Sequence, residues 1–522
     1  MPAKTKIHSF SKLEAVVIHD AEPADFERAI SASGYGRFNV ALYILSAAAG
    51  WPTVFETTAM SYVFPAAECH LRLTLDHKGW LNAITYAGMI SSAFIWGYLC
   101  DALGRKKLLI IGLLLDGLFF LMAATSQNFQ LLMISKFLGG FIINGPFAAL
   151  TAYLSEFHCA RDRGRVQMIL GTIFSMGNLI LPVLAVFILP LKINLQIGEL
   201  VFHSWNVYLM VMALPALASG AAFMFLPESP KFLMAIRDNE NALKVFRRVY
   251  SINTGLPEEE YPIRYLLNET EKNFEFEDVR VVRSKKQALK EGMSNFKPMF
   301  STPYFSKIML VFLIQFMIMM SLNTLRLWLP QIYKAMYDHQ FENDTDASLC
   351  EMLEIFQPNN ETLNFTNCQV SPDNIQVYTN SMIVAATSIV GYIMAGTLIN
   401  SIGKKTLLSI LGLVSGSVAM TMYFSRNIVS TIALSAMFVT FGSIGINVIL
   451  AVVVDIIPTS LRAMTVSLTM MFGRLGAALG NMIFPFLLES GCAPPFFSVG
   501  SVMLGCAFLA HYLPDTDMKA LR

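Results

Sequence analysis

The sequence predicts an all-α membrane protein whose twelve membrane helices form two similar six-helix bundles. Hydrophobic residues make up 54% of the 522 residues and charged residues only 14%, whereas about a quarter of a soluble globular chain is charged. Twelve apolar runs reach the length of about 20 residues that a membrane helix needs. Two charged motifs also recur at one displacement along the chain, because the 299 positions that separate Glu156 from Asp455 also separate Arg163 from Arg462.

The predicted membrane helices are placed by their apolar runs, and their orientation is set by the basic residues between them. Lys and Arg gather in the short loops after the second, fourth and eighth runs, which predicts that these loops and both termini are cytosolic. The runs lie near residues 38–64, 80–100, 107–126, 128–154, 166–189, 204–226, 305–333, 375–399, 406–424, 428–454, 463–488 and 493–513.

The two bundles are joined by a linker at residues 227–304. Within this linker, Leu243, Phe246, Val249 and Tyr250 recur at helical spacing, so part of it is expected to be an amphipathic helix. This helix could hold the cytosolic mouth shut, or the linker could be a solvated connector. No cleavable signal peptide is expected in the polar arm. The expected domains are a cytosolic arm at 1–36, a bundle at 37–226, a cytosolic linker at 227–304, a bundle at 305–513 and a cytosolic tail at 514–522.

The predicted outer loop at 334–374 carries signals of an extracellular or luminal environment. Three Asn-x-Ser/Thr acceptors lie in it, at Asn343, Asn360 and Asn364, and three in one loop predict glycosylation. Cys350 and Cys368 share the loop, where a disulfide can persist. We expect these two cysteines to form a disulfide, with two free thiols as the alternative.

A charged motif recurs at the cytosolic ends of the helices. Residues 97–107 read Gly-Tyr-Leu-Cys-Asp-Ala-Leu-Gly-Arg-Lys-Lys, and residues 396–405 repeat the pattern more weakly. Charges at helix ends can form ion pairs, and the arginine fork suits a carboxylate partner. Such pairs could open and close a cytosolic gate, or the charges could only orient the chain in the membrane. The expected gate residues are Asp101, Arg105, Glu156, Arg163, Glu228, Lys404, Asp455 and Arg462.

Charged residues within predicted membrane helices are costly, and they therefore indicate function. Arg474 lies near the middle of the eleventh helix and suggests an anionic substrate, although it could instead pair internally. Glu56 and Arg326 lie at similar depth in opposite halves, where they could pair, bind substrate, or let Glu56 titrate. Lys136 is expected near the outer surface with its amine reaching the membrane interface. The expected substrate-binding residues are Arg474, Arg326, Glu56, Asn178 and Asn323.

Several classes of function lack their motifs in this chain. There is no phosphate-binding loop, no zinc-ligand spacing and no nucleophile elbow, so we expect no enzyme, no bound metal and no cofactor. The formal net charge of +1 gives no indication of nucleic acid as a partner.

Several of these motifs resemble those of known families. The 97–107 motif and the Pro-Glu-Ser-Pro-Lys box at 227–231 resemble signatures of the major facilitator superfamily, and the chain further resembles the synaptic vesicle glycoprotein 2 family. The resemblance implies two bundles around a central cavity and a transporter-like or vesicle-associated role. Two departures are a shorter outer loop and Thr53 in the place of an aspartate in the first helix. The matching stretches are residues 34–38, 97–107, 153–157, 202–205 and 455–462, with the outer loop.

The position of Arg474 also resembles a basic residue that organic anion transporters carry in their eleventh helix. We therefore expect a monomeric secondary transporter of a small organic solute, more specifically an organic anion, working by alternating access with or without a coupled ion. It would lie in the plasma membrane or a vesicle membrane. The alternative is a non-transporting vesicle or surface glycoprotein that acts in trafficking through cytosolic partners.

Overall fold

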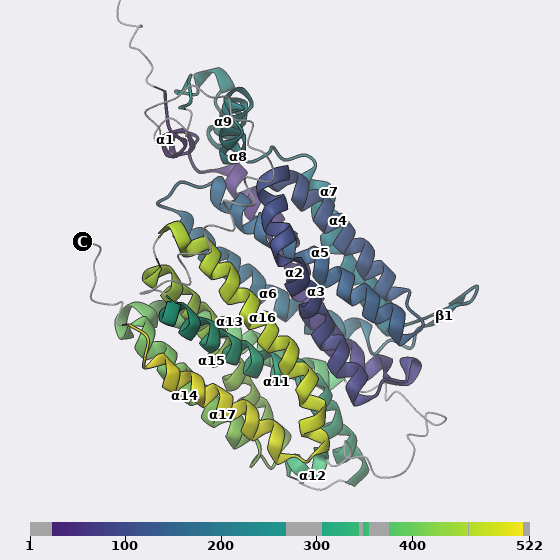
Figure 1. Cartoon of the computed structure of the whole chain (residues 1–522). Helices are drawn as coiled ribbons and strands as arrows, with labels where there is room; N and C mark the ends of the chain where they lie inside the picture. The colour runs from purple at the N-terminus through teal and green to yellow at the C-terminus, as the bar shows by residue number, and fades with distance from the viewer. Residues whose placement is uncertain (1–22, 268–304, 344–347, 354–374, 458, 515–522) are drawn as a thin grey trace, which may run out of the picture.

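The computed structural model describes residues 23–267, 305–343, 348–353, 375–457 and 459–514, and most of them are helical (Figure 1). Twelve long helices lie in two groups of six, which confirms the predicted fold class. The first half holds α2 (Arg37–Leu71), α3 (Leu75–Leu103), α4 (Arg105–Ala124), α5 (Phe129–Glu156), α6 (Arg163–Ile188) and α7 (Ser204–Phe223). The second half holds α11 (Phe305–Asn343), α13 (Ile375–Ile402), α14 (Lys404–Met422), α15 (Ile428–Ile456), α16 (Thr459–Glu489) and α17 (Ala493–Ala510).

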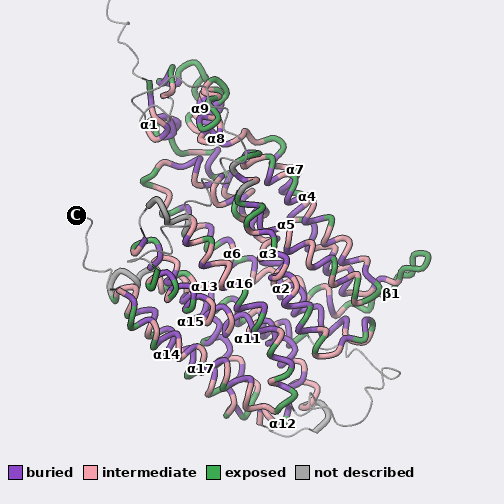
Figure 2. Tube along the Cα trace, in the orientation of Figure 1, coloured by how far each residue is buried: buried purple, intermediate pink, exposed green. Residues whose placement is uncertain are grey.

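Eleven of these helices are long and apolar enough to cross a membrane, and α3 is the twelfth long helix. Buried residues follow the faces where the helices meet one another, and exposed residues follow the outward faces (Figure 2). The protein is therefore an integral membrane protein that crosses the bilayer several times. We name the end with the predicted cytosolic loops the inner end, and the opposite end the outer end.

The helices pack in the same pairs in both halves. In the first half α4 packs on α5 and α7. In the second half its counterpart α14 packs on α15 and α17, the counterparts of α5 and α7. Between the halves, α3 packs on α16 and α6 packs on α13. Since α13 is the counterpart of α3 and α16 the counterpart of α6, both contacts join the same two positions of the repeat. The structure thus carries the internal repeat that the two displaced motifs predict.

The repeat extends to the turns that start the helices. Gly104 precedes α4 and Gly403 precedes α14, with φ of 89° and 86°, a region where a side chain is strained. Asn128 caps α5 by accepting a hydrogen bond from the backbone of Leu131, and Asn427 caps α15 through Ser430 in the same way. Both pairs are separated by the 299 positions found for the charged motifs. Asn128 and Asn427 are therefore a further sequence signal of the repeat.

The N-terminal arm and the start of the linker form one small unit at the inner end. It contains α1 (Phe26–Ala32), α8 (Pro230–Ala235), α9 (Asn239–Thr254) and the short 3-10 helix η1 (Glu258–Glu260). Phe26 and Phe246 lie at its centre with ring centroids 6.1 Å apart, and Ala24 forms a β-bridge with Leu266. The predicted amphipathic helix is confirmed as α9, with Phe246 and Val249 buried.

Asn253 near the end of α9 attaches this inner unit to the first half. Its side-chain oxygen accepts a hydrogen bond from the backbone of Phe38, 3.0 Å away, at the start of α2. Its side-chain nitrogen donates to the carbonyl oxygens of Ser33 and Gly34. One side chain of the linker helix thus contacts both the arm and the start of α2.

The outer end contains a hairpin that the sequence analysis did not predict. Strands β1 (Asn194–Ile197) and β2 (Leu200–His203) pair antiparallel, with Ile197 opposite Leu200. Gly198 in the two-residue turn has a φ of 63°, which suits the turns that join adjacent strands.

The outer loop of the second half is fixed differently from our expectation. Cys350 in α12 (Leu349–Leu353) forms its disulfide with Cys492, so the predicted bond to Cys368 is wrong. Cys69 is disulfide-bonded as well, and Cys368 lies outside the described residues. The pairing follows the fold, because α12 lies over the turn between α16 and α17. The predicted glycosylation sites stay predictions: Asn343 ends α11, and Asn360 and Asn364 lie outside the described residues.

Candidate functional site

A cavity of about 270 Å³ lies between the two halves. Helices α2, α3, α5 and α6 of the first half and α11, α13, α15 and α16 of the second contribute to its wall. Most of the wall is apolar or aromatic, with a few amides, hydroxyls and two arginines, which is the composition expected for a small-molecule site. The charged and amide side chains that line it are Arg326, Arg474, Asn178, Asn323 and Asn447.

Arg326 on α11 lies in a network of amide groups. Its guanidinium donates to the side-chain oxygen of Asn323 at 2.8 Å, one turn earlier on the same helix. It also donates at 3.3 Å to the side-chain oxygen of Asn178, on α6 of the other half. The hydroxyl of Tyr86 on α3 donates to the Asn323 oxygen at 3.4 Å. Arg326 is therefore positioned by residues from both halves.

Arg474 on α16 is more deeply buried, with 8% of its surface exposed. It donates to the side-chain oxygen of Asn144, on α5, at 2.5 Å. Its guanidinium also lies over the ring of Phe147, 6.0 Å from the centroid, which favours a cation. The Arg474–Asn144 bond thus joins the second half to the first, as the Arg326–Asn178 bond does.

The cavity brings together four of the five predicted substrate-binding residues, and Glu56 is the exception. Glu56 forms an ion pair with Lys136 inside the first half, and both side chains are 1% exposed. Of the three roles considered for Glu56 and Arg326, pairing with each other is therefore not the one found, and the expected interfacial position of Lys136 is wrong. The position of a residue along a helix predicts its depth in the membrane but not the direction in which its side chain faces.

A further buried acid lies in the first half. Asp116 on α4 has no hydrogen-bond partner for either carboxyl oxygen among the described residues.

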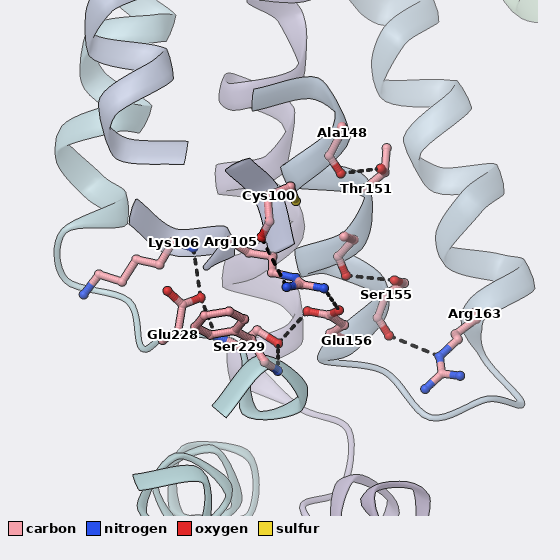
Figure 3. A network of polar contacts seen from close by, with 12 residues as sticks. Cys100, Arg105, Lys106, Ala148, Thr151, Ser155, Glu156, Arg163, Glu228 and Ser229 are labelled. Atoms are coloured by element: carbon pink, nitrogen blue, oxygen red, sulfur yellow. Dashed lines mark hydrogen bonds and ion pairs between the residues drawn. The ribbon is translucent and has the colours of Figure 1, made fainter. Parts of the chain in front are cut away.

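The inner end of the first half carries a charge cluster made of Arg105, Glu156, Glu228 and Ser229 (Figure 3). Arg105 lies 3.2 Å from Glu156, which also accepts a hydrogen bond from the Ser229 hydroxyl at 2.5 Å. Glu228 accepts a hydrogen bond at 2.9 Å from the backbone of Lys106, at the start of α4. This carboxylate therefore sits at the positive end of a helix. The structure thus brings three of the predicted gate residues, Arg105, Glu156 and Glu228, together with Ser229, which was not predicted.

The other predicted gate residues are placed separately. Arg163 points away from Glu156 in Figure 3 and pairs instead with Glu27 of the N-terminal arm. In the second half, Lys404 pairs with Asp455, and both side chains are about one-third exposed or less. The side chains of Asp101 and Arg462 fall outside the described part of the structure.

A second charge cluster, at the outer end, was missed by the sequence analysis. Glu68 at the end of α2 lies 2.8 Å from Lys78 on α3 and 2.9 Å from Lys334 on α11. Lys78 is 1% exposed, whereas Glu68 and Lys334 are 23% and 18% exposed. Because α11 belongs to the second half, Glu68 joins the two halves by an ion pair. The sequence gives only a weak signal for it, since lysines and acids near helix ends are common at membrane interfaces.

The chain matches known membrane proteins over most of its length. The family model described as Major Facilitator Superfamily matches residues 40–349 and 355–521. Synaptic vesicle glycoprotein 2B of Rattus norvegicus is 27% identical over 355 residues, which cover 65% of this chain and 51% of that protein. Synaptic vesicle glycoprotein 2C of Mus musculus is 30% identical over 243 residues, which cover 46% and 33%. The chain therefore spans about half or less of the length of these curated relatives.

Two solved structures share the fold. A D-xylose-proton symporter aligns with a TM-score of 0.63 and 14% identity, over 93% of this chain and 99% of that chain. The xylose transporter XylE from E. coli, in a partially occluded inward-open conformation, aligns with a TM-score of 0.64 and 14% identity over 93% and 100%. At this identity the likeness shows the fold alone. Because the family model covers most of the sequence, the chain belongs to the Major Facilitator Superfamily.

Proposed function

We propose that the protein is a secondary transporter that moves a small organic anion across the membrane by alternating access. The observation that carries this proposal is the charge of the central cavity. Two guanidinium groups, Arg326 and Arg474, line it, and no Asp or Glu appears among its described lining residues. Such a site attracts an anion, and its aromatic and methionine walls suit an organic body.

Alternating access draws support from the arrangement of the two ends. The outer end is joined across the halves by Glu68 and Lys334. At the inner end, the described ion pairs of Arg105 with Glu156 and of Lys404 with Asp455 each join residues of one half. The halves can therefore separate at the inner end without breaking either of those pairs. In this proposal, the structure represents a state in which the cavity is closed toward the outside.

The test is a ligand search followed by uptake. Purified protein is screened for a raised melting temperature against organic anions, organic cations and sugars, since a ligand of the native state stabilises it by mass action. Anions that stabilise the protein are then tested for uptake into proteoliposomes. Arg474→Ala is expected to abolish uptake while the amount of reconstituted protein is unchanged. Uptake by Arg474→Ala at the normal rate would contradict the proposal.

A coupled proton is a further element of the proposal. The two solved neighbours include a protein named as a proton symporter. The first half here holds the buried Glu56–Lys136 ion pair and, near it, the buried Asp116. Two carboxyls and one ammonium in an apolar interior are most easily neutralised when one carboxyl binds a proton. Uptake driven by an inward proton gradient, and lost in Asp116→Asn, would support this coupling.

The second candidate function is a non-transporting membrane glycoprotein that acts through partners. The compact inner unit favours it, because α1, α8 and α9 form a separate core with surface of their own. The curated relatives are also named as synaptic vesicle glycoproteins. Deleting residues 1–32, which removes α1, separates the two functions. A transporter is expected to keep ligand binding, whereas a trafficking protein is expected to lose its location in the cell.

A further inference from the structure

The two arginines of the central cavity each form a hydrogen bond with an asparagine of the opposite half. Arg326 on α11 donates to Asn178 on α6, and Arg474 on α16 donates to Asn144 on α5. Both arginines belong to the second half and both asparagines to the first. These contacts therefore connect the halves at the position where a ligand would bind.

The partners of both arginines are neutral. An amide oxygen satisfies a guanidinium N–H but leaves its positive charge in place, whereas an Asp at the same position would cancel it. Neither arginine takes part in an ion pair among the described residues, and no carboxylate lines the cavity. The cavity thus holds two positive charges inside a membrane protein, where an uncompensated charge is costly.

Both charges line the same cavity of about 270 Å³, so one small ligand can contact both. Tyr86 lines it as well, and its hydroxyl donates to the Asn323 oxygen that accepts from Arg326. The Nε of Arg326 is buried and has no hydrogen-bond partner among the described residues. The Nε–H of Arg326 is therefore still available to donate to a ligand, although the guanidinium already donates to Asn178 and Asn323.

We infer that the ligand of this cavity carries two separate carboxylates, one for each arginine, and that they displace Asn178 and Asn144 from the guanidinium groups. This inference rests on the proposed function and specifies its substrate class. Two carboxylates balance the charge of the site, whereas one leaves a guanidinium uncompensated. A carboxylate can accept two parallel N–H bonds from a guanidinium and cancels its charge, which a single amide oxygen cannot do, so the carboxylates outcompete the amides.

The displacement also links binding to movement. The Arg326–Asn178 and Arg474–Asn144 bonds cross from one half to the other, and the arginines that bind the ligand are the same ones that make these bonds. A dicarboxylate that takes over both guanidinium groups removes both bonds together. A monocarboxylate removes only one and leaves the halves connected at the other.

The test compares ligands of equal size that differ by one charge. Binding of phthalate and of its monoamide phthalamate, and of glutarate and its monoamide glutaramate, is measured by calorimetry on the purified full-length protein. The pH is about 7.5, where the carboxyls are ionised. Each dicarboxylate is expected to bind at least about tenfold more tightly than its monoamide, or about 1.4 kcal/mol.

Substitutions at one position separate charge from shape. Asn178→Asp places a carboxylate beside Arg326 and is expected to reduce the dicarboxylate preference to below about threefold, because one positive charge is cancelled. Asn178→Ala removes the amide without adding charge and is expected to keep the preference. Asn144→Asp and Asn144→Ala repeat the comparison at Arg474, and melting temperatures identify variants that do not fold.

Each outcome decides the inference. Equal binding of dicarboxylate and monoamide, or an undiminished preference in both Asp variants, overturns it while anion transport stands. Binding of none of the four compounds overturns it as well. Failure of the proposed function is seen separately, as normal uptake of a screened ligand by Arg474→Ala.

Discussion

The two ends of the protein carry charge clusters of similar composition but different connection. At the inner end, Arg105 pairs with Glu156, and both residues belong to the first half. At the outer end, Glu68 contacts Lys78 of its own half and Lys334 of the other. A cluster within one half stabilises the shape of that half, whereas a cluster between halves also controls their separation. An ion pair can therefore control the gate only when its two members come from the two sides of the gate.

The largest effect is expected for Glu68→Gln. Removing the acid leaves Lys78, which is 1% exposed, without its partner, and breaking a buried pair in this way costs about 3–5 kcal/mol. Part of this cost can be relieved if the outer end opens and water reaches the lysines. The variant is expected to melt at lower temperature and to expose a cysteine placed at Ser381 in the cavity to an impermeant reagent added outside. Unchanged labelling relative to the same cysteine in the wild-type background would show that Glu68 does not hold the outer end closed.

Glu156→Gln is the matched change at the inner end, and a smaller effect is expected. Arg105 is 16% exposed and also donates to the carbonyl of Cys100, so it keeps one partner and some water. The expected loss of stability is about 1–3 kcal/mol, the cost of an unpaired hydrogen-bonding group near the surface. Labelling of the cavity cysteine from outside should stay at the wild-type level. Increased outside labelling in this variant would remove the distinction between the two ends.

Lys334→Met separates the connecting role of Glu68 from its role within the first half. The ion pair of Glu68 with Lys78 remains, so the fold of the first half should be nearly as stable as before, within about 1 kcal/mol. Outside labelling of the cavity cysteine should nevertheless rise. A large drop in melting temperature without a change in labelling would assign the whole cluster to stability.

The smallest effect is expected at Lys404 and Asp455. Their side chains are 27% and 33% exposed, and exposed pairs typically contribute at most about 1 kcal/mol. A double-mutant cycle of Lys404→Ala and Asp455→Ala, measured by melting temperature, should therefore give a coupling below about 1 kcal/mol. A coupling of several kcal/mol would mean that this pair is shielded from water as the outer cluster is.

The sequence predicted those features that depend on local pattern or on the repeat. The membrane helices follow from apolar length, and the partners of Arg105 and Lys404 follow from charges at neighbouring helix ends. Arg326 and Arg474 were found because a charge in a membrane helix is rare. Glu56 was misplaced because rotation about the helix axis depends on packing: it faces Lys136 on α5 and not the cavity.

Contacts between distant segments could not be predicted in this way. Glu68 and Lys334 are separated by 266 positions and resemble ordinary interface charges. Cys350 had three other cysteines on the outer side, Cys69, Cys368 and Cys492, and only the placement of α12 selects Cys492. The asparagine partners of the cavity arginines were also missed as partners, because their choice depends on how the halves face each other.

The attachment of the inner unit through Asn253 has a practical consequence. This side chain binds the arm and the start of α2 at once. We therefore expect the inner unit to move together with the first half when the angle between the halves changes. One fluorophore on the exposed surface of α9 and another at the inner end of α14 would then report the angle between the halves by energy transfer. A change in this angle on ligand binding would then be measured with both labels at the inner end, away from the cavity.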